Sequence, residues 1–258
     1  MPALRRARAR LQLAALLLLV VGAPACSGPP ERVETGTSVS SDVRPPAAPA
    51  PRTSQRQVTE AELPAFSSSV SRIGPRLRER MAFSYRAGCP VGLRHLRYLR
   101  VRFVGFGGGA RTGRIVVHAS QAAAVVTVFR RLYAARWPLR RMRLVDHYQG
   151  DDDLSMAANN TSGFNCRRVA GADRWSEHSF GRAIDLNPVQ NPYVTGSSVS
   201  PEEGRRYARV DRSADAPRRR GVIRAGDVVV RAFGRIGWEW GGTWIHSKDY
   251  QHFSASGR

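Results

Sequence analysis

The chain has 258 residues, which leaves room for one domain and a terminal tail but not comfortably for two domains. Its 41 lysine and arginine residues exceed its 20 acidic residues and give a formal net charge of +21. This charge favours polyanionic partners such as nucleic acid, anionic lipid or an acidic wall polymer, but the export features at the N-terminus argue against nucleic acid.

Residues 1–26 have the organisation of a signal peptide. Four arginines between residues 5 and 10 precede an apolar run at 11–21, which is too short to span a bilayer comfortably. Ala23 and Ala25 occupy the small-residue positions that a signal peptidase reads. Cys26 follows directly, so cleavage before a lipid-modified cysteine is equally open, and its acyl chains would tether the protein to the membrane. We therefore expect an exported protein, extracellular or in the cell envelope.

Residues 27–80 are predicted to be a spacer and lead-in. Up to about Gln57 this stretch is rich in Pro, Ser and Thr and has almost no large apolar residue. Such a composition cannot bury enough surface to offset the entropy of ordering the chain. We expect the folded domain to occupy residues 81–258.

Hydrophobic periodicity predicts the elements of that domain. Alternating apolar and basic residues indicate strands, three- and four-residue apolar spacing indicates helices, and polar turn-forming residues indicate a surface loop. In chain order we expect strands at 99–104 and 114–118, a helix at 121–137, a strand at 142–148, a surface loop at 151–162, a strand at 183–186, a helix at 228–236 and a strand at 250–254. These elements predict an α+β fold, a small antiparallel sheet with helices packed on one side.

The chemically informative stretch is S-E-H-S-F-G-R-A-I-D-L-N-P, residues 176–188. Gly181 allows a turn, and on the strand that follows Asp185 faces away from the apolar positions. His178 lies on the far side of this turn, so its side chain and that of Asp185 can converge. A second stretch, D-Y-Q-H-F, adds His252 with Asp249 three residues before it.

These residue types suit a hydrolytic zinc site. Zinc in such a site takes three protein ligands from His, Asp or Glu and keeps a fourth position for water, while a further carboxylate acts as the base. His178, Asp185 and His252 would supply the ligands, and Asp249 the base. Each residue alone is weak evidence, because a single histidine is more often an ordinary surface or core residue and an aspartate after a turn is usually a cap.

The two motifs, with G-W-E-W-G-G-T-W between them, resemble the VanY-like D-alanyl-D-alanine carboxypeptidases, a family of zinc metallopeptidases. The most similar branch contains the L-alanyl-D-glutamate endopeptidases of phage endolysins, which the stretch S-M-A-A-N-N-T-S-G-F-N-C-R at 155–167 also resembles. The similarity covers about residues 88–253. It implies a single zinc peptidase domain with a hedgehog-like or D-Ala-D-Ala-peptidase-like fold.

The resemblance also implies the roles of individual residues. It implies one zinc ion on His178, Asp185 and His252, with Asp249 as the general base. The arginine of the family, which steadies an oxyanion or a substrate carboxylate, falls at Arg167, or at Arg168 because the register is uncertain by one residue. The chain departs from the family pattern at Ser254, where an acidic residue often stands, and some relatives have Glu at the position of Asp249.

Cys89 and Cys166 are a candidate disulfide, because an oxidising compartment favours pairing of two distant cysteines. The alternative is two buried thiols. A bridge would help to fix Arg167, the neighbour of Cys166.

Several other residues are candidates for a role in the site. Trp238, Trp240 and Trp244 either line a substrate groove or, as is more common, belong to the core. His246 competes as a ligand but stands where the family has no metal residue. Asn159 and Asn160 are expected to orient backbone or substrate through their amides.

The prediction is a peptidase that acts, as a monomer with one Zn²⁺, on the stem peptides of peptidoglycan. Removal of a terminal D-Ala and an internal cut such as L-Ala–D-Glu are both open. An anionic wall polymer and, through Cys26, the membrane are further expected partners. The alternative is a catalytically silent wall-binding module on the same fold.

Overall fold

A four-stranded sheet organises the part of the chain that the computed structural model describes, residues 62–257. Its antiparallel strands β1 (Ser68–Arg72), β2 (Leu96–Gly105) and β3 (Ala110–His118) lie side by side in this order. β4 (Pro138–Leu139) pairs in parallel with the end of β2, beyond the residues that β1 covers. The predicted strands at 99–104 and 114–118 fall within β2 and β3.

Two smaller antiparallel sheets complete the strand pairing. One has the order β5-β10-β8 and the other the order β7-β6-β9. Their strands are β5 (Ala183–Asp185), β6 (Tyr193–Thr195), β7 (Ser198–Ser200), β8 (Glu239–Trp240), β9 (Lys248–Asp249) and β10 (His252–Ser254). The single sheet that the sequence predicts is therefore three sheets, because the C-terminal strands pair with one another and not with β2 or β3.

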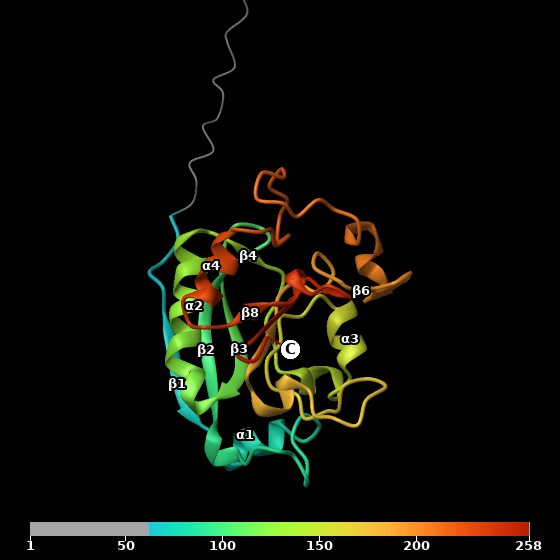
Figure 1. Cartoon of the computed structure of the whole chain (residues 1–258). Coiled ribbons are helices and arrows are strands. Elements are labelled where there is room, and N and C mark those ends of the chain that lie inside the picture. The colour runs from blue at the N-terminus through green and yellow to red at the C-terminus, as the bar shows by residue number, and fades with distance from the viewer. Residues whose placement is uncertain (1–61, 258) are drawn as a thin grey trace, which may run out of the picture. The chain divides into compact units, whose positions relative to one another are not determined.

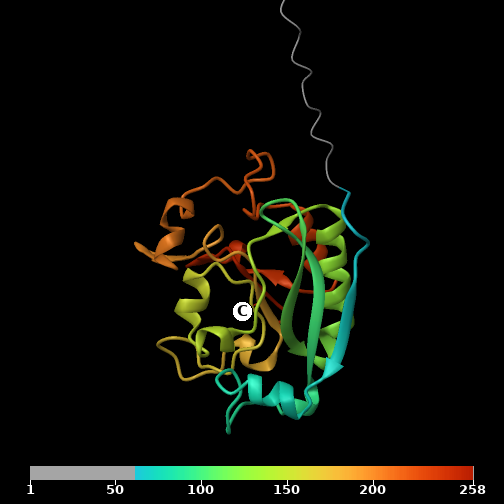
Figure 2. The ribbon, with the colours of Figure 1, turned by 180° about the vertical axis from the view of Figure 1, so that it is seen from behind.

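The helices of the described residues are α1 (Pro75–Arg80), α2 (Ala122–Ala134), α3 (Asp152–Ala157) and α4 (Val228–Gly234). Short 3₁₀ turns lie at Leu93–His95, Ala119–Gln121, Val145–Tyr148, Glu177–Phe180, Glu202–Tyr207 and Gly241–Thr243. α2 lies along one face of the four-stranded sheet, and α3 lies on the side away from α2 (Figure 1, Figure 2). The α+β class is confirmed.

The core follows the alternation of the strands. On β2, Leu99, Val101 and Phe103 are buried in the cluster that also contains Phe129 of α2, whereas Arg100 between them is exposed. Fully burying side chains of this size stabilises a fold by about 1.5–3 kcal/mol each. This packing explains why the predicted helix and strands form where they do.

A second apolar cluster, around Val116, Phe164 and Cys166, includes side chains of β2 and β3 that are not in the first. The predicted disulfide is present here. Cys89 and Cys166 are joined by an S–S bond of 2.05 Å with their Cα atoms 5.8 Å apart.

The predicted strand at 142–148 is wrong. Val145–Tyr148 is a 3₁₀ turn, and the Asp146 carboxylate accepts hydrogen bonds from the backbone N–H groups of Phe83 and Ser84 at 2.9 and 2.8 Å. These contacts come from a segment more than sixty residues away, so they hold the backbone in a turn that the local alternation does not show.

The predicted surface loop at 151–162 is also wrong. It contains α3 and then runs into the interior, where Asn160 and Thr161 are fully buried. Asn160 makes this possible because its amide accepts a hydrogen bond from Arg143 N–H at 2.9 Å and donates one to the Arg143 carbonyl at 3.1 Å. Asn159 also binds the backbone, since its Oδ1 accepts a hydrogen bond from Val189 N–H at 3.1 Å. Both side-chain amides therefore orient backbone, one of the two roles expected for them.

The folded part extends into the stretch predicted as lead-in, because strand β1 and helix α1 lie between residues 68 and 80. The predicted signal peptide at 1–26 with Cys26, and the spacer up to residue 61, lie outside the described residues. No helix formed by residues 62–257 combines the length and the apolar character needed to cross a membrane.

Candidate active site

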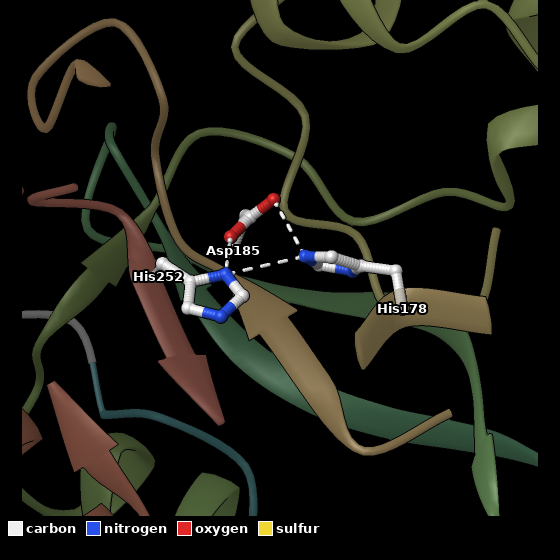
Figure 3. A group of neighbouring side chains, drawn as sticks. All are labelled: His178, Asp185 and His252. Carbon is white, nitrogen blue, oxygen red and sulfur yellow. Dashed lines mark hydrogen bonds and ion pairs between the residues drawn. The ribbon is translucent and has the colours of Figure 1, made fainter. Parts of the chain in front are cut away.

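Three predicted ligands meet at the junction of β5 and β10. His252 stands directly opposite Asp185 in this antiparallel pair, so both side chains project from the same face. The neighbouring pair, Ile184 and Phe253, projects into the core from the other face. His178 reaches the same point from the 3₁₀ turn that precedes β5 (Figure 3).

The distances among the three side chains suit a small cation. His178 Nε2 lies 3.1 Å from Asp185 Oδ2, His252 Nδ1 lies 3.0 Å from Asp185 Oδ1, and the two nitrogens are 3.3 Å apart (Figure 3). Ligand atoms about 2.0–2.1 Å from a tetrahedral zinc ion are about 3.3 Å apart. All three residues are buried, and a cation between them would balance the carboxylate and accept both nitrogen lone pairs.

The orientation of the His178 ring is fixed by a hydrogen bond from the nitrogen that faces away from the site. Its Nδ1 lies 2.7 Å from the Gly163 carbonyl oxygen, which can only accept, so Nδ1 carries the proton and Nε2 presents its lone pair to the site. A Cβ atom on Gly163 would lie 2.6 Å from the Val116 carbonyl oxygen, so a side chain there would push the segment away. Only glycine therefore lets this carbonyl approach His178.

The glycine turn between His178 and Asp185 has the predicted role. Gly181 has φ +66°, a left-handed conformation that glycine adopts without strain. Its carbonyl accepts a hydrogen bond from His118 N–H at 2.8 Å, and an added Cβ would lie 2.6 Å from that nitrogen. The turn thus ties the ligand segment to the end of β3.

Asp185 is held as an anion. Burial alone would raise the pKa of its carboxyl group, but the contacts with His178 and His252 outweigh burial and hold that pKa well below its usual range. A deprotonated carboxylate is the form that binds a metal ion.

Asp249, the predicted base, lies at the end of β9 and lines the same cavity as the three ligands. Its Oδ1 oxygen is enclosed and has no hydrogen-bond partner among the described residues. Burial raises the pKa of this carboxyl group to about 7. A carboxyl group with a pKa near neutrality is suited to accept and release a proton.

The cavity has a volume of about 650 Å³. Besides the ligands and Asp249, its walls include Arg167 and Trp244. Arg167 Nη2 lies 2.7 Å from Asp152 Oδ2, and its Nε is buried without a partner among residues 62–257. The site therefore combines a candidate metal centre, an unpartnered carboxylate oxygen and a guanidinium.

Residues 170–255 match the family model described as D-alanyl-D-alanine carboxypeptidase. The matched segment is about a third of the chain and is similar to this family. It includes His178, Asp185, Asp249 and His252, and it begins just after Arg167. The searches of curated proteins and of solved structures gave no match. This match supports a peptidase, and the His-Asp-His group of the chain can hold a metal ion.

The structure distinguishes between Arg167 and Arg168, the two candidates for the arginine of the site. Arg167 lines the cavity, whereas Arg168 does not. Arg168 forms an ion pair with Asp173 at 2.7 Å and stacks its guanidinium over Trp175 at 4.5 Å. Of the two alternatives, Arg167 is the one at the site.

The tryptophans divide between the two predicted roles. Trp238 and Trp240 are buried in the main core cluster, and Trp244 lines the cavity. His246 is exposed and is not one of the grouped ligands.

The sequence reasoning missed Gly163 and Ser179. Ser179 is fully buried; its Oγ donates to the Arg167 carbonyl at 2.6 Å and accepts from Arg167 N–H at 2.9 Å. It thereby joins the segment of His178 to the segment of Arg167. The available signals were weak: a serine beside the ligand histidine and a glycine within the 155–167 stretch.

Proposed function

We propose that the protein is a zinc-dependent peptidase that hydrolyses peptide bonds in the stem peptides of peptidoglycan. One observation carries the proposal: His178, Asp185 and His252 converge at ligand spacing in a cavity that Asp249 also lines. The Asp249 Oδ1 oxygen has no hydrogen-bond partner within residues 62–257. The family match supports peptidase activity, and peptidoglycan is proposed as the substrate from this match and the expected export.

Two imidazoles and one carboxylate are a donor set that zinc accepts in hydrolytic enzymes. A zinc ion bound by them would polarise the carbonyl of the scissile bond and make a water molecule acidic enough to attack near neutral pH. The contact between His178 and Gly163 fixes the ring whose lone pair must face the ion.

Asp249 is proposed as the general base. Its carboxylate takes a proton from the attacking water and then delivers that proton to the amine that leaves. Its Oδ1 oxygen has no hydrogen-bond partner among the described residues, so no other contact there competes for its lone pairs.

Arg167 is proposed to stabilise the negative charge that develops on the carbonyl oxygen or to hold a substrate carboxylate. Its ion pair with Asp152 and the backbone contacts with Ser179 preorganise it, and a preorganised cation is the kind that contributes to catalysis. The neighbouring Cys166, bridged to Cys89, adds a covalent restraint.

We also propose that the protein works outside the cytoplasm as a monomer. Residues 1–26 would direct export, Cys26 would serve as the lipid anchor if the signal is of the lipoprotein type, and the basic surface would favour anionic wall polymer.

The test is to incubate purified protein with defined muropeptides and to read product masses, with and without a metal chelator. Loss of a terminal D-Ala would identify a carboxypeptidase, and an internal L-Ala–D-Glu cut an endopeptidase. Asp249→Ala should abolish either product. Wall binding without hydrolysis, equal with and without zinc, would instead identify a silent wall-binding module.

A further inference from the structure

The segment before the metal-ligand motif forms a short antiparallel ribbon from residues 167–169 and 174–176. Arg168 and Trp175 are paired across it, and the N–H of the next residue after Arg168 donates to the Arg174 carbonyl at 2.9 Å. Side chains alternate between the two faces of such a ribbon. Arg168 and Trp175 therefore lie on one face, and the residues on either side of each lie on the other.

The second face forms one wall of the active-site cavity. Arg167, Val169, Arg174 and Ser176 all line this cavity, together with His178. Two arginines of the ribbon thus face the place where a peptide would bind.

These two arginines differ in their partners. Arg167 forms an ion pair with Asp152 at 2.7 Å. The Arg174 side chain, in contrast, has no ion pair, hydrogen bond or aromatic contact within residues 62–257. Unpaired exposed arginines are common on so basic a chain, but Arg174 is distinguished by its position on the cavity wall.

We propose that Arg174 determines specificity by binding a carboxylate of the substrate. This inference rests on the proposed peptidase function and deepens it. A guanidinium presents paired N–H donors that match the two oxygens of a carboxylate.

The position of Arg174 limits where that carboxylate lies. Arg174 stands two strand residues, about 7 Å, beyond Ser176 as the ribbon runs away from His178. An extended peptide advances about 3.3 Å per residue. Because Arg174 and His178 line the same cavity, the carboxylate that Arg174 binds is expected on a residue near the scissile bond.

Two stem-peptide carboxylates lie beside the candidate scissile bonds: the C-terminal carboxylate beside a terminal D-Ala bond, and the carboxylate of the D-glutamyl residue beside an L-Ala–D-Glu bond. The first would make Arg174 a determinant of carboxypeptidase activity, and the second a determinant of endopeptidase activity. Substrates in which one or the other is converted to a carboxamide separate the two.

The experiment compares wild type, Arg174→Gln and the control Arg168→Gln, which removes the same charge from the opposite face of the ribbon. Each is assayed on the unmodified muropeptide, on its C-terminal amide and on the form with D-isoglutamine. Arg174→Gln should raise KM about tenfold on the unmodified peptide with kcat nearly unchanged, the size expected for one charge-assisted hydrogen bond at a partly exposed site. Arg168→Gln should change KM less than about twofold, as expected for an exposed ion pair.

If wild type and Arg174→Gln have the same KM on one of the amidated substrates, the carboxylate replaced in that substrate is the one that Arg174 binds. An effect of Arg174→Gln that is the same on all three substrates, or no larger than that of Arg168→Gln, overturns the inference and leaves the proposed function standing. If wild type hydrolyses none of the peptides, the same comparison is made by calorimetric Kd. A charge-dependent loss of affinity in Arg174→Gln then supports the inference although the proposed function has failed, and an unchanged Kd removes the inference.

Discussion

Replacing both Cys89 and Cys166 by serine tests how the fold supports the site. The bridge joins residues 77 positions apart, and a cross-link that closes a loop of this length removes unfolded-state entropy worth about 4.5 kcal/mol. For a domain of this size that loss corresponds to a Tm lowered by on the order of 10 °C. The three proposed ligands lie outside the loop, so metal binding should survive.

Denaturant unfolding of oxidised wild type, reduced wild type and the double-serine variant measures this loss. Both unbridged proteins should unfold well below the denaturant concentration needed for the oxidised protein, the double-serine variant lowest because Cys166 is buried among apolar side chains. Metal content should be unchanged, while kcat/KM should fall because Arg167 follows Cys166 directly. An unchanged midpoint would refute the entropic estimate, and loss of the metal or unchanged kinetics would refute the claim that the bridge acts through Arg167.

Three further predictions concern the site and the surface. In the metal-free protein the folded pKa of Asp249, raised to about 7 by burial, exceeds the unfolded value, so the wild type should lose stability as pH rises from about 4 through 7. Asp249→Asn should remove this pH dependence and be the more stable protein at pH 8 by up to a few kcal/mol in urea unfolding, and parallel pH profiles for the two proteins would contradict it. A Cβ atom added at Gly241 would lie 2.7 Å from the backbone carbonyl oxygen of Asp249 and 2.9 Å from the Cβ atom of Asp249. Gly241→Ala should therefore cost about 1–3 kcal/mol in thermal unfolding and lower kcat, and wild-type kinetics would show that this contact does not position the base. Sedimentation of the protein with purified cell wall should decrease as salt rises, and salt-independent binding would exclude an electrostatic contribution of the basic surface.

Local pattern predicted the elements whose structure depends on local contacts. β2 and β3 follow from alternation, and α2 follows from three- and four-residue apolar spacing, because each element buries its own apolar face against the next. The metal group was predictable in part from local pattern, because a glycine turn and strand alternation allow His178 and Asp185 to converge. The resemblance to a known family was needed to join His252 to them.

Segments held by distant polar contacts were not predictable. Residues 142–148 alternate like a strand, but the Asp146 carboxylate binds backbone N–H groups of residues 83 and 84. Residues 151–162 are polar like a loop, but the Asn160 side chain enters the interior and forms hydrogen bonds with the backbone N–H and carbonyl of Arg143. In both cases the partner is a group whose proximity no local pattern reveals.

The choice between Arg167 and Arg168 also required the fold. Sequence similarity left the register open by one residue, and a one-residue shift on a ribbon moves a side chain to the opposite face. The pairing of Arg168 with Trp175 fixes the register and turns Arg167 toward the cavity.

The most direct test of the central claim is the zinc content of purified protein after dialysis, measured for wild type and for His178→Ala, Asp185→Ala and His252→Ala alongside muropeptide hydrolysis. Circular dichroism controls for folding in each variant. We expect one zinc ion per chain in wild type, and loss of both the ion and hydrolysis in every folded variant. Full zinc content in the variants, or hydrolysis that continues after chelation, would contradict a catalytic metal held by these three side chains.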